Sequence, residues 1–460
     1  MNRTPRPRLL SLGLALSVLV ALVACRARAA GAQQLTADST VRLTLGEAVR
    51  LAARQNAAVD GARARVAAAS ARVTQRRADL LPTFSAAVTE RGATTNSATF
   101  PIEFPTAPGQ RPLFDPSGAI LGPVNVFDAR ARMSQMLLDP AARTRIRSAR
   151  TGVEAASAEV ESIADLAAAA AANAYLAVLR ADAVYSARLA DSTLAAELLG
   201  IAQNQLKAGT GIALDVTRSR SQLTGARTQL IMARNERDRT RVDLARALGL
   251  PLVRLELADA LSSLPLAPAV SESASLTAAS SNRKDLHALE LLARGARQQA
   301  AAIRGERLPT VGVFFDEGQT QRNGRSFLPT YDWGVQVSIP IFDGFRREGR
   351  VAEQLSVARD LDIRTRDLHA QVEADVRSAT LNLRSSAEAV EAARERLALA
   401  EQEVAQARER FQAGVAGNAD VITASITLNG ARTQLVDALT SYHASRVALA
   451  RAEGSITAIE

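Results

Sequence analysis

The chain shows two kinds of pattern. In short segments apolar and polar residues alternate, and two very long stretches are typical of helices. Alternation with period two covers residues 83–89 and 127–134, and again 311–315 and 331–339. This pattern predicts two pairs of strands, each with one apolar and one polar face. Half-buried strands of a soluble sheet would look the same, but Asp128, Arg130 and Arg132 follow one another on one polar face. Those charges require water on that side of the strand.

Each pair of strands is followed by a stretch in which nothing interrupts a helix. After Pro140, residues 141–207 contain no proline and two glycines, and residues 345–413 contain no proline and one glycine. A helix of nearly seventy residues is about 100 Å long. In the second stretch a large apolar residue recurs every seven positions, which predicts coiled-coil packing rather than ligand contact: Leu383, Val390, Leu397, Val404 and Phe411. The first stretch keeps this row at Val178, Tyr185, Leu199 and Leu206.

The sequence also contains an internal repeat. The hexapeptide GARTQL occurs at Gly225–Leu230 and at Gly430–Leu435, an offset of 205. Leu81-Pro82-Thr83 matches Leu308-Pro309-Thr310 at offset 227, and Ser134–Asp139 matches Ser338–Asp343 at offset 204. We therefore expect two repeats, residues 43–250 and 273–456, with a proline-bearing linker at 251–272.

Each repeat is predicted to run helix, strand, loop, strand, long helix, turn and return helix. The first helices are expected over Leu45 to about Asp79 and about Leu276 to Arg307, each stopped by the Leu-Pro-Thr match. The return helices are expected over Ala213 to about Leu248 and Ala419 to about Glu453. Glycines in the connecting turns suit the left-handed conformation at a helix end: Gly209, Gly211, Gly414 and Gly417.

Residues 1–32 have the pattern of a secretory signal, with basic residues before an apolar run from Leu9 to Ala24. The run ends in Leu22-Val23-Ala24-Cys25, which resembles a bacterial lipobox and makes Cys25 a lipidation candidate. Ordinary cleavage after residue 29 or 32, with Cys25 discarded, is an equal alternative. Either route takes the mature protein out of the cytoplasm, and we expect no second helical membrane span.

Charge and composition exclude other classes of function. The net charge is +9, but five arginines and no acid lie in residues 1–32, so +9 minus 5 leaves +4, and the remaining charges are interspersed. We therefore expect no nucleic-acid partner. His287, His369 and His443 are scattered, and no phosphate-binding glycine loop follows a strand. The chain is therefore predicted to be no enzyme and to hold no cofactor or metal.

Four amphipathic strands cannot close a membrane barrel, which needs about eight or more, and unpaired strand edges are not stable in lipid. If the strands insert, several chains must each contribute four, and three chains would give twelve. The alternative is a soluble periplasmic coiled-coil scaffold or adaptor. That alternative explains the heptads but not the charged strand faces, nor Trp333 and Tyr331 at the positions of an interfacial girdle.

Several segments in this order resemble the outer membrane efflux proteins, the TolC-like family. They are Leu43–Ala52, the two Leu-Pro-Thr strand starts, Ser338–Gly344, and Arg410–Gly414 leading to Asp420-Val421. The resemblance implies a mainly helical fold with a small β part. It also implies a homotrimer with a twelve-stranded outer-membrane barrel and a helical tunnel across the periplasm. The implied partners are outer-membrane lipid, a periplasmic adaptor and an inner-membrane pump, and the implied function is an efflux or type I secretion duct.

The resemblance further implies a gate at the helix tips. The family's gate aspartate, six residues after the tip glycine, corresponds to Asp420, and a second aspartate corresponds to Thr423, so a less negative ring is expected. The tyrosine and arginine that lock the closed state correspond to Phe411 and Ala416. Because Phe411 has no hydroxyl to offer Asp215, the lock must differ or be weaker. The competing interpretation is that Asp215 and Asp420 cap the return helices and pair with their dipoles.

Overall fold

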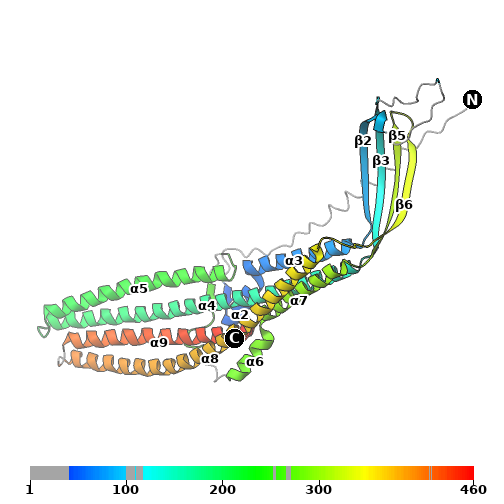
Figure 1. The fold of residues 1–460 in the computed structure, drawn as a ribbon. Helices are drawn as coiled ribbons and strands as arrows, with labels where there is room; N and C mark the ends of the chain where they lie inside the picture. Colours follow the sequence, from blue (N-terminus) through cyan, green and yellow to red (C-terminus); the bar gives the residue numbers. More distant parts are fainter. Residues whose placement is uncertain are drawn as a thin grey trace, which may run out of the picture.

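The computed structural model describes residues 41–99, 109, 118–251, 255–265, 271–413, 415 and 417–459. The described chain is an elongated molecule with a curved sheet at one end and two helical hairpin turns at the other (Figure 1). The predicted class, mainly helical with a small β part, is confirmed. The predictions for Cys25, Gly414 and Ala416 fall on residues outside those that are described.

Four long strands form one antiparallel sheet in the order β2-β3-β5-β6. Their bounds are β2 Thr83–Asn96, β3 Ile120–Leu138, β5 Thr310–Arg322 and β6 Leu328–Ser338. All four predicted strands are present, although Ile339 lies just beyond the end of β6. In the described part of the chain β2 pairs only with β3, and β6 pairs only with β5, so both outer edges of the sheet are open.

The register places the predicted apolar residues together on one face of the sheet. Phe84 lies opposite Met133, which lies opposite Phe315, which in turn lies opposite Trp333. The large apolar side chains of this face are exposed in the single chain: Phe84, Val88, Phe315, Tyr331, Trp333, Val335 and Val337. Such a continuous apolar surface requires a cover, either protein or lipid.

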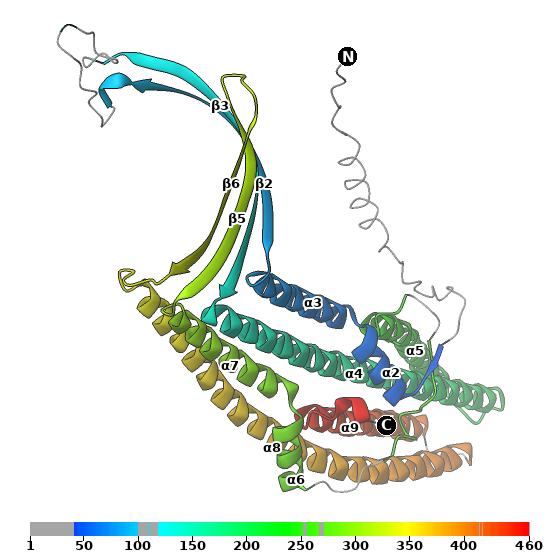
Figure 2. The same ribbon diagram turned by 90° about the vertical axis from the view of Figure 1, so that its right-hand side faces the viewer.

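The two long helices are α4, Pro140–Lys207, and α8, Arg346–Gln412, with 68 and 67 residues. Each turns back at the tip into a return helix, α5 (Ala213–Ala247) after α4 and α9 (Asn418–Ala452) after α8. On the tip side, α4 contacts α5 and α9, and α8 contacts α9. On the sheet side, α4 lies between α3 and α7, and α7 lies between α4 and α8 (Figure 2).

Each predicted first helix is in fact two helices. In the first repeat, α2 (Leu45–Gln55) and α3 (Ala57–Ala78) are separated by Asn56, which has extended backbone. The Asn56 side chain accepts a hydrogen bond from Ala58 N and donates one to Ala247 O, 3.0 Å away. In the second repeat, α6 (Glu272–Asn282) and α7 (Lys284–Gly305) are separated at Arg283. The prediction of continuous helices is wrong because capping by Asn56 and a bond to α5 outweigh helix propensity there.

The predicted linker also carries structure. A short strand β4, Leu255–Leu257, pairs in parallel with β1, Val41–Leu43, at the other end of the first repeat. The Tyr175 hydroxyl, buried on α4, lies 3.0 Å from Leu43 O and 2.8 Å from the Asp259 carboxylate, which share its one donor proton. The largest apolar core surrounds this point, so the linker is fastened to the middle of the helices.

The heptad prediction is confirmed for α8 and partly wrong for α4. On α8 the row Leu383, Val390, Val404 and Phe411 is buried, and Leu397 is half-buried. On α4 Val178 is buried, whereas Leu206 is exposed and Leu199 is only half-buried. In this part of α4 the buried residues are instead Ala195, Leu198 and Ala202.

One described helix, α4, has the length and composition to cross a membrane, with a mean hydropathy of 1.5 over its most apolar window. The sequence had suggested that no such segment follows residue 32. Half of that window is buried in the protein, where Ala168, Ala171 and Ala172 are fully covered. The apolar character of this stretch is therefore explained by helix packing.

Candidate pore gate and pore wall

The two hairpin turns lie at the end of the molecule opposite the sheet (Figure 1). In the first turn, Gly209 has φ of +76°, the left-handed conformation predicted for it. The amides of Thr210 and Gly211 both donate to Gln205 O at 3.0 Å, which closes the end of α4. In the second turn, Gly417 has extended backbone and stands immediately before α9. The described residues of the two turns are exposed apart from the half-buried Gly211.

A pore-lining residue would face solvent, but Phe411 does not. It is 2% exposed and packs with Leu198, Ala202 and Val421, which come from α4 and α9. The Phe411 carbonyl accepts a hydrogen bond of 2.9 Å from the Gln205 side-chain amide. Phe411 therefore joins the two hairpins through apolar packing and one bond to its backbone.

Asn418 is a residue that sequence reasoning missed. It is the first residue of α9 and is fully buried. Its side-chain nitrogen donates to Ser219 Oγ at 2.8 Å and to Asp215 O at 3.0 Å, both on α5. Its side-chain oxygen has no hydrogen-bond partner among the described residues. Asparagine at a helix start is read from sequence as a cap, and only its alignment with Ala213 of the first repeat could have marked it as different.

Asp215 and Asp420, the predicted gate carboxylates, do not cap the return helices. The residues before α5 and α9 are Ile212 and Gly417, and neither helix start has a side-chain cap bond. Asp215 and Asp420 both lie in the first helical turn, where the helix dipole favours a negative charge. The capping interpretation is therefore wrong for both residues, while the dipole interpretation agrees with their positions.

Asp420 begins an exposed polar row along α9. Asp420 and Thr423 are both exposed, and the Thr423 hydroxyl is used within the helix, donating to Ala419 O at 3.0 Å. Among the described residues nothing pairs with the Asp420 carboxylate. Exposed residues continue at helical spacing along the same face: Gly430, Gln434, Asp437 and Ser441. A water-filled space beside α9 would meet this row.

Above the tips, a buried carboxylate holds α9 against α4. Asp191 on α4 is 5% exposed and receives Arg432 from α9 at 2.9 Å and Arg188 from its own helix at 3.2 Å. Burial raises the pKa of Asp191 above its ordinary value, and the two arginines oppose that shift. With its nitrogen turned toward Asp191, the Asn429 amide donates to the same carboxylate. Removing the carboxylate would leave the half-buried Arg432 without its partner.

The second face of the sheet carries a ladder of charges. Arg130 on β3 binds Asp128 at 2.7 Å and reaches Asp316 on β5 at 2.9 Å. Arg132 binds the other oxygen of Asp316 at 3.0 Å, so that Asp316 is only 1% exposed. Gly318 lies opposite Arg130, and a Cβ there would stand 2.5 Å from the Arg130 Cβ. This face is thus suited to line water, and the opposite face to meet lipid.

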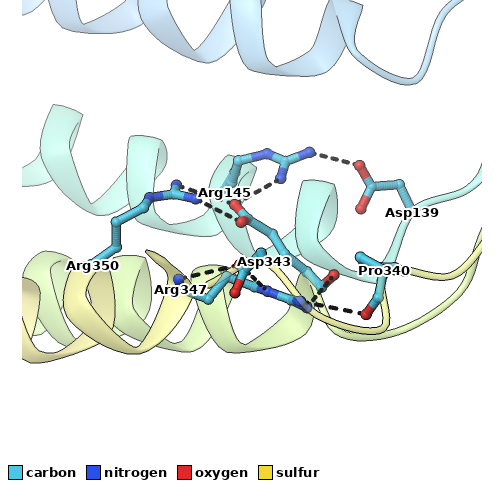
Figure 3. Close-up of polar contacts among 7 residues, drawn as sticks. Asp139, Arg145, Pro340, Asp343, Arg347 and Arg350 are labelled. Carbon is cyan, nitrogen blue, oxygen red and sulfur yellow. Dashed lines mark hydrogen bonds and ion pairs between the residues drawn. The ribbon is translucent and has the colours of Figure 1, made fainter. Parts of the chain in front are cut away.

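A cluster of ion pairs fixes the sheet to the helices (Figure 3). Arg145 on α4 binds Asp139 at 2.6 Å and lies 3.8 Å from Glu306, which Arg350 on α8 binds at 2.7 Å. Arg347 donates to Asp343 at 2.7 Å, and its hydrogen bond lowers the Asp343 pKa. Sequence reasoning did not find this cluster, because it joins residues more than 160 positions apart.

No group of three or more histidine, cysteine or acidic side chains is placed to hold a metal ion within the described part of the chain. His443 is 1% exposed on α9, and burial lowers its pKa to about 4. Its ring packs edge-on against the Tyr442 ring, 5.2 Å between centroids. His443 is therefore a core residue. His287 lies on α7 and His369 on α8, and the three histidines form no such group among the described residues.

Comparison with known proteins identifies a family model and a relative that this chain matches. The family model described as outer membrane efflux protein matches residues 48–250 and 276–455. The alkaline protease secretion protein AprF of Pseudomonas aeruginosa is 26% identical over 254 residues, which is 52% of this chain and 51% of AprF. The alignment thus spans about half the length of AprF.

Solved structures share the fold over most of its length. The Campylobacter jejuni CmeC outer membrane channel superposes with a TM-score of 0.73 at 16% identity, covering 89% of this chain and 85% of CmeC. The open state of the Neisseria gonorrhoeae MtrE outer membrane channel gives a TM-score of 0.70 at 17% identity, covering 89% and 88%.

Proposed function

Because the chain belongs to the outer membrane efflux protein family, we propose that it is the exit duct of a tripartite efflux or type I secretion system. It is a passive conduit that runs across the periplasm and through the outer membrane. The observation that carries the proposal is the sheet, with an apolar exposed face, a charged face and two open edges, mounted on helices about 100 Å long.

The duct is a homotrimer. Four strands per chain are too few for a membrane barrel, and open edges are not tolerated in lipid, so β6 of one chain must meet β2 of another. A head-to-tail interface of this kind makes a closed ring when its rotation closes. Three chains supply twelve strands around one lumen, lined by the ladder of Asp128, Arg130, Arg132 and Asp316.

The two repeats support the same closure in the helices. In the second repeat α7 lies between α4 and α8, and α9 also contacts both. Their counterparts in the first repeat, α3 and α5, lie against α4, but in the described part of the chain neither packs extensively against α8. If the repeats are equivalent, α8 of a neighbouring chain fills the missing place beside α3 and α5. The same step that pairs β6 with β2 then closes the tunnel.

The gate lies at the hairpin tips. Asp420 from three chains would form an uncompensated negative ring, with Thr423 one turn further along each helix. The resting state would be held by Phe411 in its apolar site, by the Gln205 bond to its carbonyl, and by Asn418 bonded to α5. These contacts take the part that a tyrosine and an arginine play elsewhere in the family. An adaptor that engages the turns carrying Gly209, Gly211, Gly414 and Gly417 would pull against them.

Partners and cargo follow from this architecture. The exposed tips would meet a periplasmic adaptor, which links the duct to an inner-membrane pump that supplies the energy. The name of AprF describes protease secretion, so protein export is one cargo class for this chain. The exposed apolar face of the sheet would be solvated in a soluble scaffold, which disfavours that alternative.

Conductance of the purified protein in a planar lipid bilayer tests the proposal. Uniform single-channel steps, appearing only with preparations that contain the oligomer, are expected. A matched preparation unfolded and refolded as monomer serves as the control and should be silent. A protein that never conducts, in any oligomeric state, would contradict the duct.

A further inference from the structure

The strand registers of the two hairpins are related by the offsets of the internal repeat. In the first hairpin Thr83 lies opposite Ser134, and in the second Thr310 lies opposite Ser338. Adding 227 to Thr83 and 204 to Ser134 gives Thr310 and Ser338, the offsets that the sequence matches show. The repeat thus preserves the pairing of strands, residue by residue.

This relation predicts the register at the missing seam. Within the chain the two hairpins meet through β3 and β5, where Ser134 lies opposite Phe314. The same relation applied to β6 and to β2 of the next chain places Ser338 opposite Ala87. It also places Gln336 opposite Thr89 and Gly334 opposite Arg91, all on the charged face of the sheet.

The seam within the chain shows what an arginine does in that position. Arg130 lies opposite Gly318 and reaches diagonally to Asp316, two residues along β5, at 2.9 Å. At the predicted seam Arg91 lies opposite Gly334, and Asp332 is two residues along β6. Diagonal neighbours on one face of a sheet are about 7–8 Å apart at Cα, within reach of an arginine.

Within the described part of the chain, neither member of this pair has a charged partner. Asp332 lies opposite Asp316, whose carboxylate is already bound by Arg130 and Arg132. Like charges directly opposite each other destabilise a sheet. Neither Asp332 nor Arg91 has an ion pair among the described residues, and both are exposed at the two open edges. The edges are therefore complementary in charge at the level where the repeat brings them together.

We propose that Arg91 of each chain pairs with Asp332 of the next chain inside the barrel lumen. This inference rests on the trimer proposed above. The occupant of the open β6 edge is thus a second copy of this chain, in the register with Gln336 opposite Thr89. On the lipid face the same register sets Trp333 against Gly92 of the next chain. The bulky ring covers the strand where it has no side chain.

Cysteine pairs test the register directly. Thr89→Cys with Gln336→Cys should give covalently linked trimers, since opposed residues have Cα atoms about 4.5–5.5 Å apart, which a disulfide accepts. Pairs displaced by two residues, Ala87→Cys with Gln336→Cys and Thr89→Cys with Ser338→Cys, should link much more slowly. The single-cysteine variants control for Cys25, the sole native cysteine. Faster linking of either displaced pair would overturn the register.

Charge exchange tests the pair itself. Arg91→Asp and Asp332→Arg should each lower the temperature at which the trimer dissociates in detergent, and the double exchange should restore it. Arg322→Asp reverses a charge on the same face of β5 and is the control. Combining it with Asp332→Arg should not raise the temperature at which the trimer dissociates. A conducting trimer that the double exchange fails to restore would overturn the pair and leave the duct intact. A parent chain that forms no trimer would overturn both.

Discussion

The side-chain nitrogen of Asn418 lies 2.8 Å from Ser219 Oγ, and this bond ties the start of α9 to α5. The two residues belong to different hairpins and different repeats, 199 positions apart. The same nitrogen also donates to Asp215 O at 3.0 Å. Both bonds would have to break for the α8–α9 hairpin to move away from the α4–α5 hairpin.

Asn418→Ala is therefore expected to make the closed tip easier to open. Each lost hydrogen bond is worth about 0.5–1.5 kcal/mol, and the loss of the unpartnered side-chain oxygen offsets part of that. A rise of up to about tenfold in the open fraction of single channels follows from roughly 1.4 kcal/mol. The control is Asn204→Ala, an exposed asparagine on α4 at the same tip. Equal open fractions in the two variants would argue against the lock.

Phe411→Ala should loosen the tip further, because it empties an apolar site shared by α4, α8 and α9. Truncating a buried phenylalanine costs about 3–5 kcal/mol. We expect amide exchange to quicken at the end of α8 and the start of α9 while the sheet keeps its protection. Leu399→Ala, at an exposed position on α8, provides the comparison. Unchanged exchange at the tip would show that Phe411 is not part of the closure.

Asp420→Asn is expected to reduce the preference of the channel for cations, since it neutralises an exposed carboxylate on each chain. Thr423→Asp should raise that preference. The reversal potential under a salt gradient measures both, and the effect should shrink as ionic strength rises. Glu401→Gln removes a charge from α8 away from the Asp420 row and should have little effect. Identical reversal potentials in all variants would remove Asp420 from the pore.

Acid should destabilise the helical part through His443. Its pKa in the folded chain is lowered to about 4 by burial, against 6.5 for the free side chain. The neutral ring therefore contributes stability above about pH 6.5, and this is lost as the pH falls toward 4. The thermal midpoint of His443→Gln should fall less between pH 7 and 4.5 than that of the parent. Parallel slopes would show that another group is responsible.

Periodicity predicted the elements because their causes are local. The alternation of Phe84 and Val88 with polar residues is visible in the sequence whatever place the strand takes in the fold. The helix predicted from Pro140 to Lys207 agrees with α4. The breaks at Asn56 and Arg283 were missed because each helical run is favourable on its own. At Asn56 the decisive contact is a bond to Ala247 O, 191 positions away.

The candidate site was less predictable than the fold. Family resemblance located Asp420 and Phe411, and burial then gave Phe411 an apolar role that its position alone did not specify. Asn418 looks like an ordinary cap in sequence, and Arg145 and Glu306 carry no motif. Their meaning depends on which helices lie side by side, and only the packed chain shows that.

If each chain supplies a third of a closed barrel, as we propose, the number of chains in one membrane-embedded particle is the decisive quantity. Native mass spectrometry of protein extracted from outer membranes counts those chains without cross-linking. We expect particles of three chains, with no larger series. A stable single chain embedded in lipid, or an open-ended series beyond three, would contradict it.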